Sequence, residues 1–322
     1  MNISRFFTHR LANLFETAII MAALFCLLIL IAWLFAGTTG ILFVCIAGVP
    51  ALIFGGAQAG RLVLRMYRAK PLTYHSSPDL VELIEELARR AELPEKPQLF
   101  YIPSTAPLAF SVGLGSSGAI ALSDGLLRLL SWREIAGVVA HEVSHISGRD
   151  IKVMGVADVA SRLVSAISFA GQMLIIVNLP LYLLGDVRLP WIPLIVMLLA
   201  PMLMTLLQLA LSRSREYEAD RAAAHLTGDP LGLASALESM ERFQHQQLRR
   251  LFLPYGKVEV PSILRTHPGT ATRIERLVDL ANVGVSVTAD SYAPFEDRVH
   301  QTLRGLDVPT RHPRRRLSGI WY

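Results

Sequence analysis

Residues 135–145 read IAGVVAHEVSH, and this stretch decides the fold and the chemistry predicted for its surroundings. A run of small and branched apolar residues leads directly into His141, Glu142 and His145. On a helix, positions i and i+4 share one face, so both imidazoles can point at one metal ion. A glutamate directly after the first histidine of such a pair reaches a zinc-activated water as general base. The stretch therefore predicts one zinc ion (Zn²⁺) per chain, with His141 and His145 as ligands and Glu142 as a catalytic residue.

The start of this helix is also marked in the sequence. Ser131 precedes Trp132, and Glu134 follows three residues after the serine, which is a capping-box pattern. The alternative interpretation is a surface helix with two solvated histidines. Because the helix is strongly apolar before His141, the pair lies at the edge of a core, where histidines without a ligand are costly. This position favours the metal site.

A catalytic zinc site needs a third protein ligand and keeps one position open. Residues 214–220 read SREYEAD and open a second helix, in which Glu216 and Asp220 lie one turn apart. In this arrangement Glu216 can bind the metal while Asp220 accepts a hydrogen bond from a ligand histidine. Spacing alone does not separate Glu216 from Glu218, and a plain acidic helix start is the alternative interpretation.

The chain is 52% hydrophobic and 18% charged, a balance that predicts segments in lipid. Residues 17–60 form a stretch of 44 without Asp, Glu, Lys or Arg, and one membrane crossing needs about 20 residues. A Gly-Thr-Thr-Gly turn at 37–40 divides this stretch, so we predict two helices, over 15–36 and 41–62, in an N-terminal hairpin of residues 1–69. The doubled length argues against a cleaved signal peptide.

A second apolar pair follows the metal motif. Residues 163–185 and 189–212 carry no charge, and Asp186-Val187-Arg188 separates them. We predict a second membrane hairpin within 156–212, although a pair of buried core helices in a soluble domain is the alternative interpretation. The fold class is therefore mainly α, with four transmembrane helices in two hairpins.

Basic residues near the ends of spans indicate the cytoplasmic side. The two hairpin turns carry Arg188 alone, whereas the other ends of the spans carry Arg5, Arg10, Arg61, Arg65, Arg68, Lys70, Arg149, Lys152, Arg213 and Arg215. We therefore predict an integral protein of the cell's inner or plasma membrane, with both termini and the catalytic domain in the cytoplasm. The net charge of +5 is explained by these flanks, and no nucleic-acid partner is expected because no basic helix with interleaved aromatics occurs.

The remaining residues predict a zincin-like α+β catalytic domain with a small edge sheet, divided into 70–155 and 213–290 and followed by a basic tail, 291–322. Periodicity and turn residues indicate helices over 79–93, 214–225, 231–253 and 270–280, a strand over 98–102, and two short strands within 109–122. We expect an extended substrate to lie beside the strand at 117–122 by strand addition.

On the basis of these motifs, the chain resembles the HtpX-like membrane metalloproteases, relatives of the CAAX prenyl endopeptidase. The HExxH motif is followed by a basic-acidic pair, Arg149-Asp150, and 216–220 matches the family's E-[aromatic]-x-A-D, with a membrane hairpin between the two motifs. The resemblance implies Glu216 as third ligand, Asp220 as the residue that orients a ligand, and a role in quality control with damaged or misfolded membrane proteins as substrates.

Two further stretches bear on the resemblance. Thr266-His267-Pro268, followed by Arg273-Ile274, resembles a late family segment, which implies that His267 lies near the scissile carbonyl and donates to the oxyanion. A helix-start histidine beside a proline is the alternative interpretation. Leu108 stands where the family often has an asparagine before Ala-Phe, so the polar anchor for substrate backbone is missing here.

Three other functions are alternatives to a zinc-dependent membrane endopeptidase. A prenyl-protein processing protease fits the motifs, but four membrane helices are fewer than that branch has. A non-catalytic membrane adaptor with a structural zinc would have no use for a base at Glu142. A protease with its HExxH buried in lipid needs an aspartate in a later membrane helix, and 163–185 and 189–212 contain none.

Overall fold

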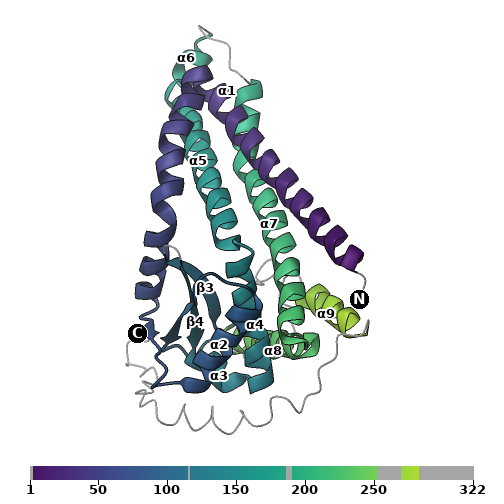
Figure 1. The fold of residues 1–322 in the computed structure, drawn as a ribbon. Helices are drawn as coiled ribbons and strands as arrows, with labels where there is room; N and C mark the ends of the chain where they lie inside the picture. The colour runs from purple at the N-terminus through teal and green to yellow at the C-terminus, as the bar shows by residue number, and fades with distance from the viewer. Residues whose placement is uncertain (1–2, 115–116, 186–190, 253–269, 283–322) are drawn as a thin grey trace, which may run out of the picture.

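The computed structural model describes residues 3–114, 117–185, 191–252 and 270–282. Three long helices, α1 (Ile3–Met66), α5 (Asp150–Val177) and α7 (Trp191–Thr227), form a tower that narrows toward the short helix α6 (Leu179–Leu183). The base of the tower holds a small sheet and the helices α2 (Pro78–Arg90), α3 (Asp124–Leu129), α4 (Trp132–Ser147), α8 (Pro230–Phe252) and α9 (Thr270–Asn282) (Figure 1).

Helix α1 is broken at Ala36 and Gly37, where the predicted turn begins. Gly37 has a φ of 59°, in the left-handed region that glycine enters without a Cβ penalty. The chain reverses there, and its two halves descend on different sides of the tower (Figure 1). Among the described residues, three helices are long and apolar enough to cross a membrane by length and composition: Phe15–Ile46, Asp150–Val177 and Trp191–Thr227. A separate span over 41–62, and with it the total of four, stays a prediction.

The boundaries of the second apolar pair differ from the prediction. Helix α5 begins at Asp150 rather than near Leu163 and ends at Val177. Pro180 has no N–H to donate to the carbonyl of Ile176, so the helix could not continue through it without losing that hydrogen bond. The predicted turn at 186–188 lies outside the described residues. Helix α7 is continuous from Trp191 to Thr227, whereas the sequence indicated two helices, one in the apolar stretch 189–212 and one over 214–225.

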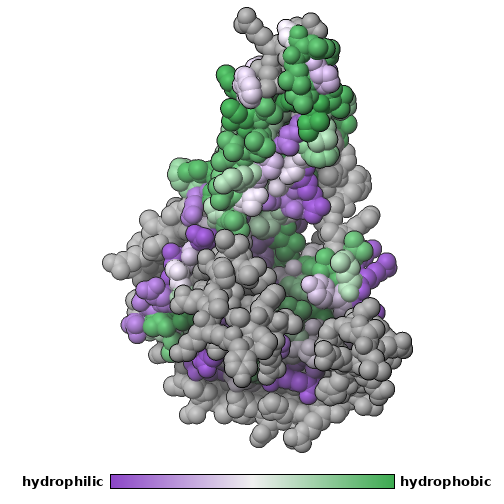
Figure 2. Space-filling model, turned by 180° about the vertical axis from the view of Figure 1, so that it is seen from behind, coloured by the Kyte–Doolittle hydropathy of each residue, from purple (hydrophilic) through white to green (hydrophobic). Residues whose placement is uncertain are grey.

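Pro201 lies inside α7 and removes the N–H that would bond to the carbonyl of Met197. Gln172 of α5 donates its side-chain amide to that carbonyl at 3.3 Å, which compensates for the loss. Leu24, Leu28, Val164 and Met204 are among the residues that form the apolar core between the three long helices. The outside of the tower is also apolar, as Figure 2 shows, which is the pattern of a surface that faces lipid.

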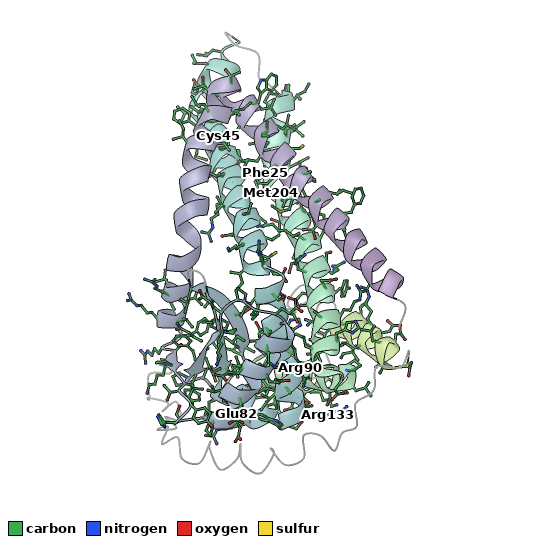
Figure 3. All side chains as sticks on the ribbon, viewed as in Figure 1. Phe25, Cys45, Glu82, Arg90, Arg133 and Met204 are labelled. Carbon is green, nitrogen blue, oxygen red and sulfur yellow. The ribbon has the colours of Figure 1, made fainter. Side chains whose placement is uncertain are left out.

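The molecule thus has an apolar tower and a base that carries charged residues. Figure 3 shows Phe25, Cys45 and Met204 in the tower, and the charged Glu82 and Arg133 in the base. This division is consistent with a base that stands outside the membrane.

The sheet contains β1 (Lys70–Pro71), β2 (Gln98–Ile102), β3 (Ala109–Leu114) and β4 (Ser117–Ser123), in the order β1-β2-β4-β3. Strand β4 pairs parallel with β2 and antiparallel with β3. The expectation that substrate lies beside 117–122 is therefore wrong, because neighbours on both sides already occupy the backbone groups of β4. The edge strand next to it is β3.

The two faces of the sheet belong to different cores. Leu99, Tyr101, Ile120 and Leu122 pack with α2, α3 and α4 in the largest core of the base. On the other face, sheet residues pack against Leu64 near the end of α1. The sheet therefore connects the metal-motif helix α4 to the first membrane helix.

Candidate metal centre

Helix α4 carries the HExxH residues, and hydrogen bonds at its N-terminus fix the position at which it begins. The predicted capping box is confirmed: Ser131 accepts from the backbone N–H of Glu134, whose side chain accepts from the N–H of Ser131 at 2.8 Å. Glu134 is held further by the hydroxyls of Ser235 and Ser239 on α8. This network fixes where α4 begins and hence where its next three turns place the histidines.

His141 and His145 point their rings at the same space. Their Nε2 atoms are 3.1 Å apart, and the rings meet edge to face. His141 is 8% exposed and Glu142 is 7% exposed. Two imidazole nitrogens at this distance inside a protein need a shared proton or a shared cation between them.

Glu216 reaches this space from α7. Its Oε2 lies 3.6 Å from Nε2 of His141, and its Oε1 lies 3.7 Å from Nε2 of His145. Ligand atoms of these three residues all lie within 4.8 Å of one another. Glu218 forms an ion pair with Arg221 of the same helix and does not join this group. The geometry thus favours Glu216 over Glu218, a choice that spacing left open.

The three residues fit a zinc ion. With zinc–nitrogen and zinc–oxygen bonds near 2.1 Å and tetrahedral angles, ligand atoms lie about 3.4 Å apart. The distances of 3.1, 3.6 and 3.7 Å lie on either side of that value. Two histidines and a glutamate are also a donor set of catalytic zinc sites, in which the fourth position takes water or substrate.

Asp220 lies one turn beyond Glu216 in α7, and its carboxylate faces the ring of His141. Its Oδ1 is 3.0 Å from Nδ1 of His141, on the ring side away from the other ligands. Arg273 of α9 donates two hydrogen bonds of 2.7 Å to the Asp220 carboxylate, and its third nitrogen lies 2.7 Å from Oε2 of Glu216. In the sequence, Arg273 appears only as part of the stretch that resembles a late family segment. The sequence did not predict its contacts with Asp220 and Glu216.

The second histidine has a matching support. Oδ2 of Asp150 lies 2.7 Å from Nδ1 of His145, and Arg215 of α7 donates from Nε to Oδ1 of Asp150. Arg215 also donates to the carbonyl of Gly148 at 3.1 Å. Arg149 adopts a left-handed φ of 56°, which turns the chain back so that α5 starts with Asp150 under the imidazole. The sequence analysis counted Asp150 only in the Arg149-Asp150 match and Arg215 only among the basic flanks, and it placed neither residue beside the histidines.

These charges determine the protonation of His141 in the metal-free protein. Burial lowers the pKa of His141, but the carboxylates of Asp220 and Glu216 outweigh burial and raise that pKa to about 10. Arg273 acts in the opposite direction, by charge repulsion. The carboxylates of Asp220 and Glu216 thus favour positive charge at this position.

A cavity of about 310 Å³ opens over the metal centre. Its walls include 109–111 of β3, Ile151 and Met154 of α5, and Leu237 and Met240 of α8. Mostly apolar walls around a few convergent polar groups are typical of a site for a ligand with apolar side chains. The predicted oxyanion donor His267 lies outside the described residues, as does the tail 291–322. Leu108 bonds to Ser123 through its backbone, at the start of β3.

Comparisons with known proteins identify the family of the chain. The profile of Peptidase family M48 matches residues 75–281. A Protease HtpX homolog of Paraburkholderia phytofirmans is 34% identical over 292 residues, which cover 84% of this chain and 98% of the relative. A Protease HtpX homolog of Methylibium petroleiphilum is 34% identical over 286 residues, covering 83% and 97%. The crystal structure of S. mikatae Ste24p is similar at 22% identity and a TM-score of 0.49, over 86% of this chain and 67% of that one.

Proposed function

We propose that this chain, which belongs to Peptidase family M48, is a membrane endopeptidase that uses one zinc ion held by His141, His145 and Glu216. Membership of the family makes it a metallopeptidase, and its long apolar helices make it an integral membrane protein. The observation that carries the ligand assignment is the approach of three ligand atoms from α4 and α7 to within 4.8 Å of one another.

Zinc, when bound, supplies a more acidic water and polarises the scissile carbonyl. Glu142 follows the first ligand histidine and lines the cavity, so it is placed to accept the proton of the attacking water. The same carboxyl then passes the proton to the leaving amine. Asp220 and Asp150 keep the histidine rings oriented through their Nδ1 atoms. His267 is proposed to donate to the oxyanion.

The substrate is proposed to be an extended segment of polypeptide. Strand β3 lines the cavity with 109–111, and an edge strand offers backbone groups to an added strand. With Leu108 in place of an asparagine, binding at this edge depends on backbone pairing and on the apolar walls of the cavity.

The relatives named HtpX homologs and the basic flanks of the apolar helices support the rest of the proposal. The membrane hairpins are residues 1–69 and 156–212, and the catalytic domain combines 70–155 with 213–290. That domain and both termini lie in the cytoplasm. Natural substrates are misfolded or damaged membrane proteins, cleaved in quality control.

The test is to purify the full chain with Glu142→Gln and with Glu218→Gln as the matched control. We expect the first variant to bind zinc as the parent does and to cleave no unfolded membrane protein. The control, on the helix that carries Glu216, is expected to keep both properties. Full activity of Glu142→Gln would refute the general-base role. Membrane proteins trapped by the inactive variant and absent with the parent would identify substrates.

A further inference from the structure

The edge of β3 has a defined set of outward-facing backbone groups. The N–H of Ser123 donates to the carbonyl of Leu108, so these two residues form a hydrogen-bonded pair between β4 and β3. In an antiparallel ladder such pairs alternate with pairs whose backbone groups face away from the partner strand. From the register of β3 and β4, Ala109, Ser111 and Gly113 therefore turn their N–H and C=O groups toward the open edge.

Helix α1 closes this edge at one of the three positions. A Cβ atom placed on Gly60 would overlap the carbonyl oxygen of Gly113, so the helix backbone lies directly against that carbonyl. This contact agrees independently with the outward direction of Gly113. One turn later, Leu64 packs on the sheet with Val112, and the ring of Tyr67 contacts that of Phe110. Figure 1 shows the second half of α1 descending onto the sheet at β3.

The remaining two positions belong to the catalytic cavity. Ala109 and Ser111 line it together with the metal-binding residues, whereas Gly113 does not. On the side of α5, Ile151 lines the same cavity and would lie 3.7 Å from a Cβ at Gly113. The edge thus runs from the cavity into a closed end formed by α1 and α5.

We propose that α1 limits strand addition to Ala109 and Ser111, and that Gly60 is the residue that allows the helix to close the edge. This inference rests on the proposed endopeptidase function. Substrate residues that pair with two outward positions of one strand are two apart, so about three residues can be held in register on this side of the scissile bond. Any further substrate residues must turn away from the sheet at α1. The site therefore suits a short extended segment of a loop or an unfolded chain, and gains nothing from a long strand.

The first test uses the full-length zinc-loaded protein and fluorogenic peptides lengthened by one residue at a time on each side of the cleaved bond. On one side, kcat/KM should rise by about threefold or more per paired residue, since each pair adds backbone hydrogen bonds, and should then stay constant after about three residues. A continued rise on both sides would overturn the inference while leaving the peptidase assignment intact. Failure of the parent to cleave any peptide, as with Glu142→Gln, would refute the proposed function itself.

The second test compares Gly60→Ala with Gly155→Ala. The same methyl group is added to two helical glycines, but at Gly155 of α5 it would meet nothing within 4 Å. We expect Gly60→Ala to displace α1 from β3 and to free the backbone groups of Gly113, so that kcat/KM keeps rising for peptides longer than about three residues on this side. Zinc content and the kcat/KM of the shortest substrates should match those of the parent, as should every property of Gly155→Ala. An unchanged length dependence in folded Gly60→Ala would overturn the role of Gly60. If that variant does not fold, the length series on the parent decides.

Discussion

His145 and Asp150 face each other across the turn between α4 and α5, with Nδ1 of the imidazole 2.7 Å from Oδ2 of the carboxylate. This contact is made at the ring nitrogen that does not face His141, and Oδ1 of Asp220 lies 3.0 Å from Nδ1 of His141 in the same way. Each carboxylate is in turn bound by an arginine from another helix, Arg215 or Arg273. The two ligand histidines are therefore oriented by separate chains of contacts that join α4 to α5, α7 and α9.

Asp150→Asn is expected to weaken zinc binding by about 10- to 100-fold, because an amide holds the imidazole less strongly in the required orientation. A zinc-competition titration with a chromophoric chelator measures the change. The control is Asp158→Asn on the same helix, whose exposed carboxylate pairs with Arg162, and which should leave zinc affinity unchanged. Equal affinity of both variants would contradict a role for Asp150 in holding the ligand.

Glu216→Ala is expected to lose zinc at concentrations that saturate the parent, since two histidines remain as protein ligands. Glu218→Ala should retain a full equivalent of zinc, because its carboxylate pairs with Arg221 rather than with the histidines. Metal analysis after gel filtration of both variants gives the answer. Loss of metal in the Glu218 variant alone would reverse the assignment.

Arg273→Gln is expected to lower the free energy of unfolding by about 3–5 kcal/mol, because it leaves the buried carboxylate of Asp220 and the partly buried carboxylate of Glu216 without their cation. Thermal unfolding in detergent measures the loss. Arg276→Gln on the same helix is the control; that side chain lies over the Tyr217 ring, and its loss should cost about 1 kcal/mol or less. A stability of Arg273→Gln equal to that of the control would show that the buried pairs contribute little.

Zinc uptake at pH 7 is expected to release about one proton from His141, since the pKa of that side chain is raised to about 10 in the metal-free site and zinc binds the neutral ring. Zinc affinity should therefore increase as the pH rises toward 10. Isothermal titration in buffers of different ionisation enthalpy counts the protons. Asp220→Asn removes one of the carboxylates that raise this pKa, so it should release fewer protons at the same pH; an equal count would contradict this explanation.

The features of the candidate site that the sequence predicts depend on residues close to one another in the chain. The spacing of His141 and His145, the cap formed by Ser131, and the strand over 98–102 all depend on residues a few positions apart, which the period of a helix or strand places on one face. The apolar runs likewise identify candidate membrane helices by length and composition, although α5 ends at Val177, before the end of its apolar run.

Only the tertiary structure decided the contacts between distant segments. Nothing in the sequence sets β3 rather than β4 at the edge, since strand order depends on which neighbour supplies hydrogen bonds. The choice of Glu216 over Glu218 depends on the rotation of α7 against α4, and the ion pair of Arg273 with Asp220 depends on the docking of α9. The sequence by itself determined the metal motif, because helix geometry relates residues within one turn. Packing between helices places Glu216, Asp150 and Asp220 beside the two histidines and α1 against β3, because it alone brings residues from different elements within bonding distance.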